Sequence, residues 1–403
     1  MTRAYIYMYP PGETELVTLG RLEVKNEIGT FVYHPDYVAR KGWVPDPIHY
    51  PLRPEPYVGI ATNSGLPGFI RDAAPDGWGE RVIAYLDGEI LSGIEYLIRS
   101  SNVDRAGSLL IGTTRRPSEA GYPDRLDRLD RFIEFMDGIQ SGGRLAIETI
   151  RAARQRSSLG GLRPKVTLLE EGRVIVAKPR DRHDVEDIPA FEHACMTFAA
   201  TKGLNVAHTR LHQRVASVLL VDRFDRVATP DGGVTRLPML SAATLLDIDW
   251  RALDSQSKSR WRYAEFADEM RRKGVPMEDL QELFKRMCFN AMVGNDDDHP
   301  KNHSVLFKDG RWRLSPMYDV VPALDGVPPP MLAMAVGQQG RRISRENMLS
   351  HAEHFGLSQE AAAAILDEVA SWECDLKDHY RHTLSNAQAD LVIRSIDTAR
   401  LRA

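Results

Sequence analysis

The strongest chemical signal in the sequence is the polar segment Gly294–Asn302, which contains three adjacent carboxylates. Neighbouring carboxylates repel one another, so such a run gains most where a cation or a substrate proton is close. Asp297 and Asn302 lie five positions apart within this segment. Phosphoryl-transfer enzymes use this spacing because the aspartate accepts the proton of the substrate hydroxyl and the asparagine holds Mg²⁺. The alternative is a solvated acidic turn in which Asn302 acts as a cap.

A further carboxylate, Asp319, follows Ser315–Tyr318 directly after a predicted strand hairpin. In kinases the hairpin after the catalytic loop delivers a second metal-binding carboxylate, and Asp319 holds the corresponding position. The alternatives for Asp319 are a helix cap or a salt-bridge partner. Together with Asp297 and Asn302, it predicts a magnesium site.

Upstream, the segment Ser157–Lys165 contains the adjacent residues Gly160 and Gly161 and leads into a predicted strand. Adjacent glycines let backbone N–H groups approach phosphate oxygens. On the next strand, Lys178 ends an apolar run that resembles the V-A-I-K strand of kinases, whose lysine pairs with nucleotide phosphates. Alternatively, Lys178 extends its amine to solvent from a strand end.

Glu192 lies in the first turns of a predicted helix that begins around Asp187-Ile188-Pro189. A capping residue followed by proline is typical of a helix start. The apolar positions of this helix are expected to be buried: Phe191, Cys195, Phe198 and Ala199. Glu192 is therefore placed to pair with Lys178, and the alternative is an exposed glutamate favoured by the helix dipole.

Periodicity predicts the elements that position these residues. Alternating residues predict strands over 4–8 and 29–33, and apolar runs predict strands over 209–212 and 217–224. Turn residues at 170–172 and 308–310 predict two hairpins, over 165–178 and 303–314. Apolar spacing over 280–291 predicts a helix that ends at Gly294.

The chain has 403 residues, of which 43% are apolar and 27% charged, and this length predicts two or three domains with sizeable cores. A sheet-rich half precedes a helix-rich half, which predicts an α+β fold with lobes on either side of a cleft. We expect domains over 1–115, 116–240 and 241–403.

The charge balance, 52 basic against 56 acidic residues, gives a net charge of −4 and excludes a general nucleic-acid coat protein. Three cysteines lie far apart and form no C-x-x-C pair, which favours a reducing compartment over a disulfide framework or a zinc site. The start has no apolar signal region, and the longest apolar runs are too short to cross a bilayer. We therefore expect a cytoplasmic protein without a membrane partner.

The chain resembles the HipA-like serine/threonine kinases, which are toxins of bacterial toxin–antitoxin modules, over nearly its whole length. Seven segments carry the resemblance: Leu66–Gly77, Asp104–Gly107, Ser158–Lys165, Val176–Pro179, Val221–Arg226, Asp297–Asn302 and Leu314–Asp319. The resemblance implies a bilobal protein-kinase-like fold. It has an extra N-terminal β-rich subdomain (1–115), a lobe with the glycine-rich loop and strand lysine (116–240) and a helical C-terminal lobe with the catalytic loop (241–403).

By this resemblance Asp297 is the catalytic base, and Asn302 and Asp319 hold Mg²⁺. The residues implied to bind ATP are Ser158, Gly160, Gly161, Lys165, Lys178, Asp222, Arg223, Phe224, His299, Lys301 and Tyr318. Of these, Asp222, Arg223 and Phe224 match the segment between the lobes whose backbone meets adenine. The family has glutamate where this chain has Asp222. The chain has no G-x-G-x-x-G, H-R-D or D-F-G motif, which argues against an ordinary protein kinase.

Ser158 matches a serine that such kinases autophosphorylate, which expels the glycine loop and stops ATP binding. Ser157 is a rival phosphosite, and the alternative for Ser158 is a hydroxyl that caps the loop. A phosphate adds nearly two negative charges that nearby arginines can capture: Arg154, Arg156 and Arg163.

The implied function is an ATP- and Mg²⁺-dependent serine/threonine kinase toxin. Family targets include aminoacyl-tRNA synthetases, and the expected partner is a helix-turn-helix antitoxin of the HipB type. Because the chain is acidic, we expect DNA contact only through that antitoxin. Two other functions stay open: a small-molecule or lipid kinase, and a pseudokinase that bridges antitoxin and DNA without catalysis.

Overall fold

The computed structural model describes residues 1–13, 15–118, 121–141, 161–213, 216–229, 233–250 and 258–402. The chain divides into two compact units, each assembled from three stretches. The first unit comprises Met1–His183, Asp222–Leu240 and Asp247–Leu253, and the second comprises Asp184–Val221, Ser241–Leu246 and Asp254–Ala403. Each unit holds part of the predicted site. The three domains expected from the sequence, 1–115, 116–240 and 241–403, stay a prediction.

An antiparallel sheet of five strands, in the order β4-β3-β2-β1-β5, opens the first unit. Its strands are β1 (Thr2–Met8), β2 (Val17–Lys25), β3 (Ile28–Tyr33), β4 (Tyr57–Ile60) and β5 (Leu109–Gly112). Alternate residues of β2 and β3 are buried, as period-2 patterning requires for a sheet with one covered face. On that face Phe31 packs against Tyr33 and Phe69, with ring centroids 4.9 Å and 5.5 Å away.

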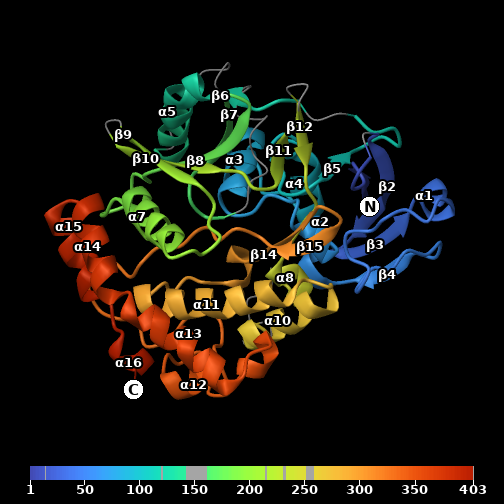
Figure 1. The fold of residues 1–403 in the computed structure, drawn as a ribbon. Helices are drawn as coiled ribbons and strands as arrows, with labels where there is room; N and C mark the ends of the chain where they lie inside the picture. The colour runs from blue at the N-terminus through green and yellow to red at the C-terminus, as the bar shows by residue number, and fades with distance from the viewer. Residues whose placement is uncertain are drawn as a thin grey trace. The chain divides into compact units, whose positions relative to one another are not determined.

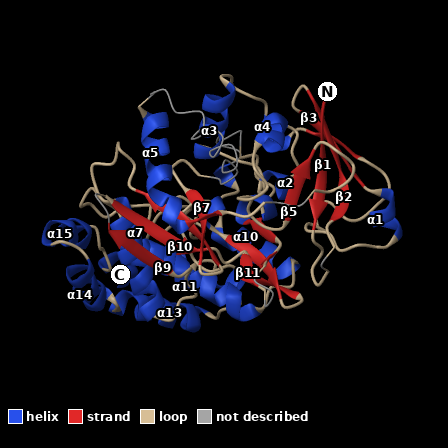
Figure 2. Ribbon diagram, turned by 90° about the horizontal axis from the view of Figure 1, so that it is seen from above, coloured by secondary structure: helices blue, strands red, loops and turns tan. Residues whose placement is uncertain are grey.

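The described helices of the first unit are short. They are α1 (Pro35–Ala39), α2 (Gly68–Arg71), α3 (Trp78–Asp87), α4 (Gly93–Arg99) and α5 (Leu129–Gln140). Gly88, with φ 76°, ends α3, and the capping box of Ser92 and Glu95 starts α4. Helix α4 packs against β1 and β5, as Figure 2 shows beside the red strands of the sheet.

The predicted hairpin over 165–178 is confirmed. Strand β7 (Val166–Glu170) pairs antiparallel with β8 (Arg173–Pro179), so that Val166 faces Ala177. Its two-residue turn has Glu171 at φ 48° and Gly172 at φ 79°, the left-handed conformation that tight hairpins favour. The first unit also contains three short strands: β6 (Asp124–Arg125), β11 (Arg226–Ala228) and β12 (Val234–Arg236).

A buried network of ionic groups joins the segment after residue 221 to the N-terminal part of the first unit. The Arg223 guanidinium donates to the Asp225 carboxylate at 2.9 and 2.7 Å and to the Asp104 carbonyl at 2.8 Å. Arg226 donates to the same carboxylate at 2.8 Å, and the Gly107 N–H donates to it at 2.8 Å. Burial by itself would raise the pKa of Asp225, but the two guanidinium groups hold it well below its usual range.

The second unit is mainly helical. Its helices are α7 (Ile188–Thr201), α8 (Ala242–Leu245), α10 (Tyr263–Arg272), α11 (Met277–Val293), α12 (Arg345–Leu349), α13 (Gln359–Ser371), α14 (Glu373–Thr383), α15 (Asn386–Arg394) and α16 (Ala399–Arg402). Its strands form two antiparallel pairs, β9 (Thr209–Gln213) with β10 (Ser217–Asp222) and β14 (Ser304–Lys308) with β15 (Arg311–Leu314). The last strand, β13 (Met239–Ser241), lies where the chain passes between units.

Helix α11 is the central helix of the second unit, and α10 and α13 pack along it (Figure 1). It ends at Gly294, as the apolar spacing predicted, and Gly294 adopts φ 70°. The other predicted elements of this unit are also present, including the Asp187 cap, whose carboxylate accepts from the Ala190 N–H at 3.3 Å. Strand β10 ends at Asp222 rather than at Phe224, because the chain turns where Arg223 enters the buried ionic network.

Both units combine helices with sheets, and the predicted α+β class is confirmed. Among the helices of the described ranges, none has both the length and the apolar composition that crossing a membrane requires.

The ionic network predicts a large effect of Asp225→Asn on stability. Removing the carboxylate charge takes away the hydrogen-bonded ion-pair partner of the buried Arg223 and Arg226, which should lower the free energy of unfolding by about 3 kcal/mol. Asp127→Asn serves as the control, because the Asp127 side chain is 70% exposed and its carboxylate is as far as 3.9 Å from the Arg125 guanidinium. This substitution should change the free energy of unfolding by less than about 0.5 kcal/mol. Urea denaturation of wild type and both variants measures these differences.

The same comparison has a defined pH dependence. The pKa of Asp225 is lower in the folded than in the unfolded protein. The carboxylate therefore makes its full contribution to the free energy of unfolding above the unfolded pKa, near 4, and loses it as the pH falls toward the folded pKa. The stability gap between wild type and Asp225→Asn should therefore narrow below about pH 4. A gap that stays small at neutral pH would contradict the role given to this carboxylate.

Candidate functional site

The candidate catalytic loop starts where α11 ends and is fixed to the helix by its first residue. Asn295 is only 2% exposed, and its N–H donates to the Asn290 carbonyl at 2.9 Å. The Asn295 side-chain amide also donates to the Asn290 side-chain oxygen at 3.3 Å, and Asn290 in turn donates to the Tyr263 hydroxyl at 3.2 Å. The loop therefore leaves the helix in one defined direction.

Asp297 and Asn302 are brought together by this loop. The Asn302 amide nitrogen donates to the Asp297 carbonyl at 3.0 Å, and backbone bonds at 2.8 Å tie His299 to Asp297 and Asn302 to His299. Asp297 is exposed, whereas Asn302 is buried. Because the amide nitrogen is used within the loop, the amide oxygen is the atom of Asn302 left to face a cation. An exposed carboxylate beside it can accept a proton from a bound hydroxyl.

The three adjacent carboxylates occupy different environments, which relieves their mutual repulsion. Asp296 and Asp297 are exposed, while Asp298 is 2% exposed and lies 2.7 Å from the His303 imidazole. The His303 ring packs against Tyr263, at 5.4 Å between centroids, and against Phe266, at 6.0 Å. The fully solvated acidic turn is therefore wrong for Asp298, which anchors the loop from inside.

Asp319 adopts a backbone conformation that a residue with a side chain rarely takes. Its φ is 61°, in the left-handed region, which costs an aspartate about 1 kcal/mol or more and is found at functional sites where the surroundings enforce it. On its N-terminal side the Tyr318 hydroxyl donates to the Lys301 carbonyl at 2.8 Å. Met317 exchanges backbone hydrogen bonds with Asn205 and Ala207 at 2.8 and 2.9 Å. The segment before Asp319 is thus tied to the catalytic loop and to the strand region after α7.

A row of polar residues on one face of α11 fixes the catalytic loop and the segment before Asp319 relative to each other. Asp279, Arg286 and Asn290 are 4%, 1% and 1% exposed, and their spacing of seven and four residues places them on one side of the helix. The Asp279 carboxylate accepts from the Arg313 guanidinium at 2.7 and 2.7 Å and from the Leu314 N–H at 2.8 Å. The pKa of Arg313 is raised by this hydrogen bond.

Arg286 is the central member of this face. Its guanidinium donates to the Ser315 carbonyl at 2.8 Å and to the Asn205 carbonyl at 3.0 Å, and it forms an ion pair with Glu282. Burial lowers the pKa of Arg286, and the Glu282 carboxylate opposes that shift. The apolar spacing of α11 did not single out these residues, although three polar residues on a buried helix face are a signal that the sequence contains.

The first unit holds the predicted residues of the nucleotide-binding part. Lys178 is half-buried at the end of β8, and Phe224 and Asp222 are also half-buried, with the Asp222 carboxylate 3.6 Å from Arg173. The Arg223 N–H donates to the Val174 carbonyl at 2.8 Å, so the backbone of the predicted adenine segment is fixed to β8. ATP binding by these residues stays a prediction.

Gly161 and Lys165 lie side by side at the described end of the glycine segment. Gly161 has φ 99°, and a side-chain carbon there would lie 2.4 Å from the Lys165 Nζ. The backbone conformation therefore favours glycine, and a side chain here would displace the flexible lysine amine. Ser157, Ser158 and Gly160, together with Arg154 and Arg156, lie outside the described residues.

Glu192 is 3% exposed in the first turns of α7, so the alternative of an exposed glutamate is wrong. The helix buries the predicted face, including Phe191, Cys195 and Phe198. Lys178 belongs to the first unit and Glu192 to the second. The ion pair between them stays a prediction.

The donor set of the second unit fits magnesium chemistry. Asn302 offers an amide oxygen and Asp319 a carboxylate, and Mg²⁺ prefers oxygen ligands, usually one or two carboxylates together with substrate phosphates and water. Among the described residues no group of three or more His, Cys, Asp or Glu side chains is placed to hold a metal ion. A nucleotide-bound Mg²⁺ does not need such a cage.

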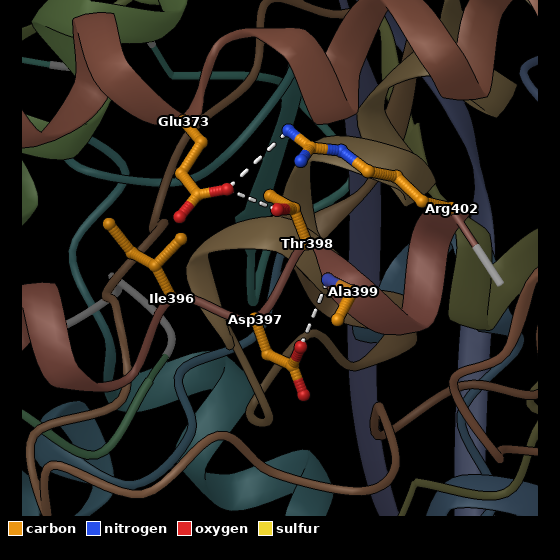
Figure 3. Close-up of a pocket in the computed structure, with 6 residues that line it drawn as sticks. All are labelled: Glu373, Ile396, Asp397, Thr398, Ala399 and Arg402. Atoms are coloured by element: carbon orange, nitrogen blue, oxygen red, sulfur yellow. Dashed lines mark hydrogen bonds and ion pairs between the residues drawn. The ribbon is translucent and has the colours of Figure 1, made fainter.

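Two cavities are lined by residues other than Asp297, Asn302 and Asp319. One, of about 560 Å³, is an open hollow on the C-terminal helices lined by Glu373, Ile396, Asp397, Thr398, Ala399 and Arg402 (Figure 3). Its polar groups bind one another, and hydrogen bonds from Lys377 and Thr398 lower the pKa of Glu373. The other, of about 140 Å³, lies in the first unit between the start of β8 and the segment Asp222–Arg226.

The role of Arg286 predicts that Arg286→Met destabilises the second unit by about 3 kcal/mol, because the Ser315 and Asn205 carbonyls and Glu282 lose a buried charged partner. Arg272→Met is the matched control, since its side chain is 58% exposed and, among the described residues, bonds only to Glu269; it should cost less than about 0.5 kcal/mol. Thermal unfolding compares the two. Equal melting temperatures for both variants would refute the anchoring role.

Comparison with known proteins shows the family of this chain. The family model of the HipA-like C-terminal domain matches residues 157–374, more than half of the chain, and that of the HipA N-terminal domain matches residues 14–92. The solved complex of HipA, HipB and operator DNA from Shewanella oneidensis MR-1 superposes with a TM-score of 0.71 at 19% identity. It covers 99% of this chain and 95% of that chain, and so shows the same kinase-like fold.

Two curated relatives also match in sequence. The serine/threonine-protein kinase toxin HipA of Shewanella oneidensis is 25% identical over 75% of this chain and 72% of its own length. Y4mE of Sinorhizobium fredii is 29% identical over 59% of this chain, and the match spans only about three-fifths of that relative, 59%. With both domain families matched in order along one chain, this protein belongs to the HipA family.

Proposed function

We propose that this chain is an ATP- and Mg²⁺-dependent serine/threonine protein kinase and acts as the toxin of a toxin–antitoxin module. The observation that carries the proposal is the catalytic loop of the second unit, with an exposed Asp297, its carbonyl held by Asn302, and a left-handed Asp319 after the next hairpin. The kinase and toxin names of the Shewanella relative support the same assignment.

In the proposed reaction the hydroxyl oxygen of a serine or threonine attacks the γ-phosphorus of ATP. The bond to the bridging oxygen breaks, ADP leaves, and Asp297 accepts the hydroxyl proton. Bound Mg²⁺ would neutralise charge on the phosphates, with Asn302 and Asp319 as its protein ligands. Lys178, Lys165, His299 and Lys301 supply positive or hydrogen-bonding groups for the phosphates, and Asp222–Phe224 supply backbone groups for adenine.

We further propose that the protein phosphorylates itself on Ser158, or on its rival Ser157, and that a target is a translation factor such as an aminoacyl-tRNA synthetase. A helix-turn-helix antitoxin of the HipB type is the proposed partner and would carry the DNA contact. The solved relative, described as a HipA, HipB and operator DNA complex, supports this arrangement. Co-purification with the helix-turn-helix protein encoded beside it would test the partner.

The other two functions receive less support. A small-molecule or lipid kinase shares the D-x-H-x-x-N pattern, but the Shewanella relative is named a serine/threonine-protein kinase. A pseudokinase would have no need of the four polar residues Lys178, Asp297, Asn302 and Asp319, all of which this chain has.

Asp297→Asn should abolish incorporation of phosphate from labelled ATP into the protein, because the substituted amide cannot accept the hydroxyl proton. We expect a loss of at least about 100-fold, the usual size of a general-base contribution. Asp296→Asn is the matched control, since it removes the neighbouring exposed carboxylate and should keep activity within about twofold of wild type.

Label on an added lipid or small alcohol with none on protein would overturn the protein-kinase assignment in favour of the second function. If wild type neither binds ATP nor labels itself, while Asp297→Asn remains as toxic as wild type in cells, the pseudokinase is correct.

A further inference from the structure

The first turn of α3 is capped by a chain segment far away in sequence. The residue before the helix is Gly77, which has no side chain to accept a hydrogen bond, so the first N–H groups of α3 need other partners. The Gly79 N–H has a local one, the Asp76 carbonyl at 3.0 Å. The Trp78 N–H donates to the Gly161 carbonyl at 2.8 Å, and the Arg81 guanidinium donates to the Leu162 carbonyl. Both acceptors belong to the described end of the glycine segment.

The contact is close enough to require glycine at position 77. A side-chain carbon on Gly77 would lie 2.6 Å from the Gly161 oxygen and 3.0 Å from the Leu162 Cα, both backbone atoms that cannot move aside cheaply. Gly77 also has φ 46° and ψ −100°, a conformation that other residues rarely adopt. Any other residue here must therefore push the glycine segment away from α3.

The segment held in this way leads directly to the predicted phosphate-binding lysines. The Lys165 amine packs beside the Cα of Gly161, and Lys165 is followed at once by β7. The first residue of β7, Val166, pairs with Ala177 in β8, the residue before Lys178. A displacement of Gly161 should therefore move the neighbouring Lys165 side chain. It should also shift β7, and with it β8 and Lys178, through the pairing of Val166 with Ala177.

We propose that the start of α3, Gly77 to Arg81, is a positioning element for the nucleotide-phosphate site, so that the N-terminal region sets the affinity for ATP. Gly77 and Arg81 act through Gly161, Leu162 and Lys165 and do not touch the nucleotide themselves. This inference rests on the proposed kinase function. It assigns to the HipA N-terminal region an indirect part in nucleotide binding, beyond the catalytic and metal-binding residues of the second unit.

The test compares two glycines at the two ends of α3. Gly77→Ala introduces the clash with Gly161 and Leu162, whereas Gly88→Ala, at φ 76° and ψ 11°, puts an alanine in the left-handed region where nothing lies within 4 Å. Both variants should lose stability, Gly77→Ala more, because its φ 46° and ψ −100° lie outside the left-handed region and because of the clash. Only Gly77→Ala should raise the KM for ATP in autophosphorylation, by about tenfold, the effect of losing one charge-assisted hydrogen bond, while kcat changes less.

Arg81→Met provides a milder variant if Gly77→Ala does not fold. It removes the bond to the Leu162 carbonyl and the contact of the guanidinium with the Trp78 ring, 5.5 Å from the ring centroid. It should raise the KM for ATP in the same direction, with partial recovery in Arg81→Lys. Equal KM values in wild type, Gly77→Ala and Arg81→Met would overturn the inference.

A second readout, independent of nucleotide, separates this inference from the proposed function. Hydrogen exchange of the full chain without ATP should be faster over residues 161–165 in Gly77→Ala than in Gly88→Ala. If exchange there is unchanged, the positioning contact is wrong whatever the activity. If exchange rises but wild type binds no ATP, the contact is correct and the kinase proposal, with the nucleotide role drawn from it, fails.

Discussion

The carbonyl of Ser315, four residues before Asp319, accepts a hydrogen bond from Arg286, a guanidinium that is only 1% exposed. A buried charge of this kind is stable only when every donor has a partner, so Arg286 dictates where the Ser315 and Asn205 carbonyls must lie. Asp279 sets the hairpin on one side and Asn290 the catalytic loop on the other. One helix face thus fixes both Asp297 and Asp319, and the left-handed backbone of Asp319 is tolerated because its surroundings are held.

In the first unit too, buried and hydrogen-bonded charged groups fix the position of the backbone. Asp225 is buried between Arg223 and Arg226 and also accepts the Gly107 N–H, which binds the predicted adenine segment to the N-terminal region. The α3 cap binds the end of the glycine segment to that region at a second point. Two parts of the proposed nucleotide site therefore depend on residues before position 110. Buried charges and close backbone contacts tolerate little displacement, which makes such supports sensitive to small changes in the N-terminal region.

Local patterns predicted most elements and the candidate catalytic residues, because a turn such as Glu170–Gly172 or the spacing of Asp297 and Asn302 lies within a few residues. The supports were missed because their partners are distant: Arg223 reaches Asp104, and Trp78 reaches Gly161. Glu192 shows a different limit. Its helix was predicted, but the sequence left open whether Glu192 pairs with Lys178 or is exposed, and the packing of α7 buries it. The φ of Asp319 has no sequence signal, since aspartate adopts that region rarely.

The central claim is that Asp297 serves transfer of phosphate from ATP to protein hydroxyl groups. Quantitative phosphoproteomics on cells that express either wild type or Asp297→Asn at equal level tests it most directly. The account predicts serine or threonine phosphopeptides that appear only with wild type, on the chain itself and on a translation factor. Indistinguishable phosphoproteomes, with both proteins folded and equally abundant, would contradict it.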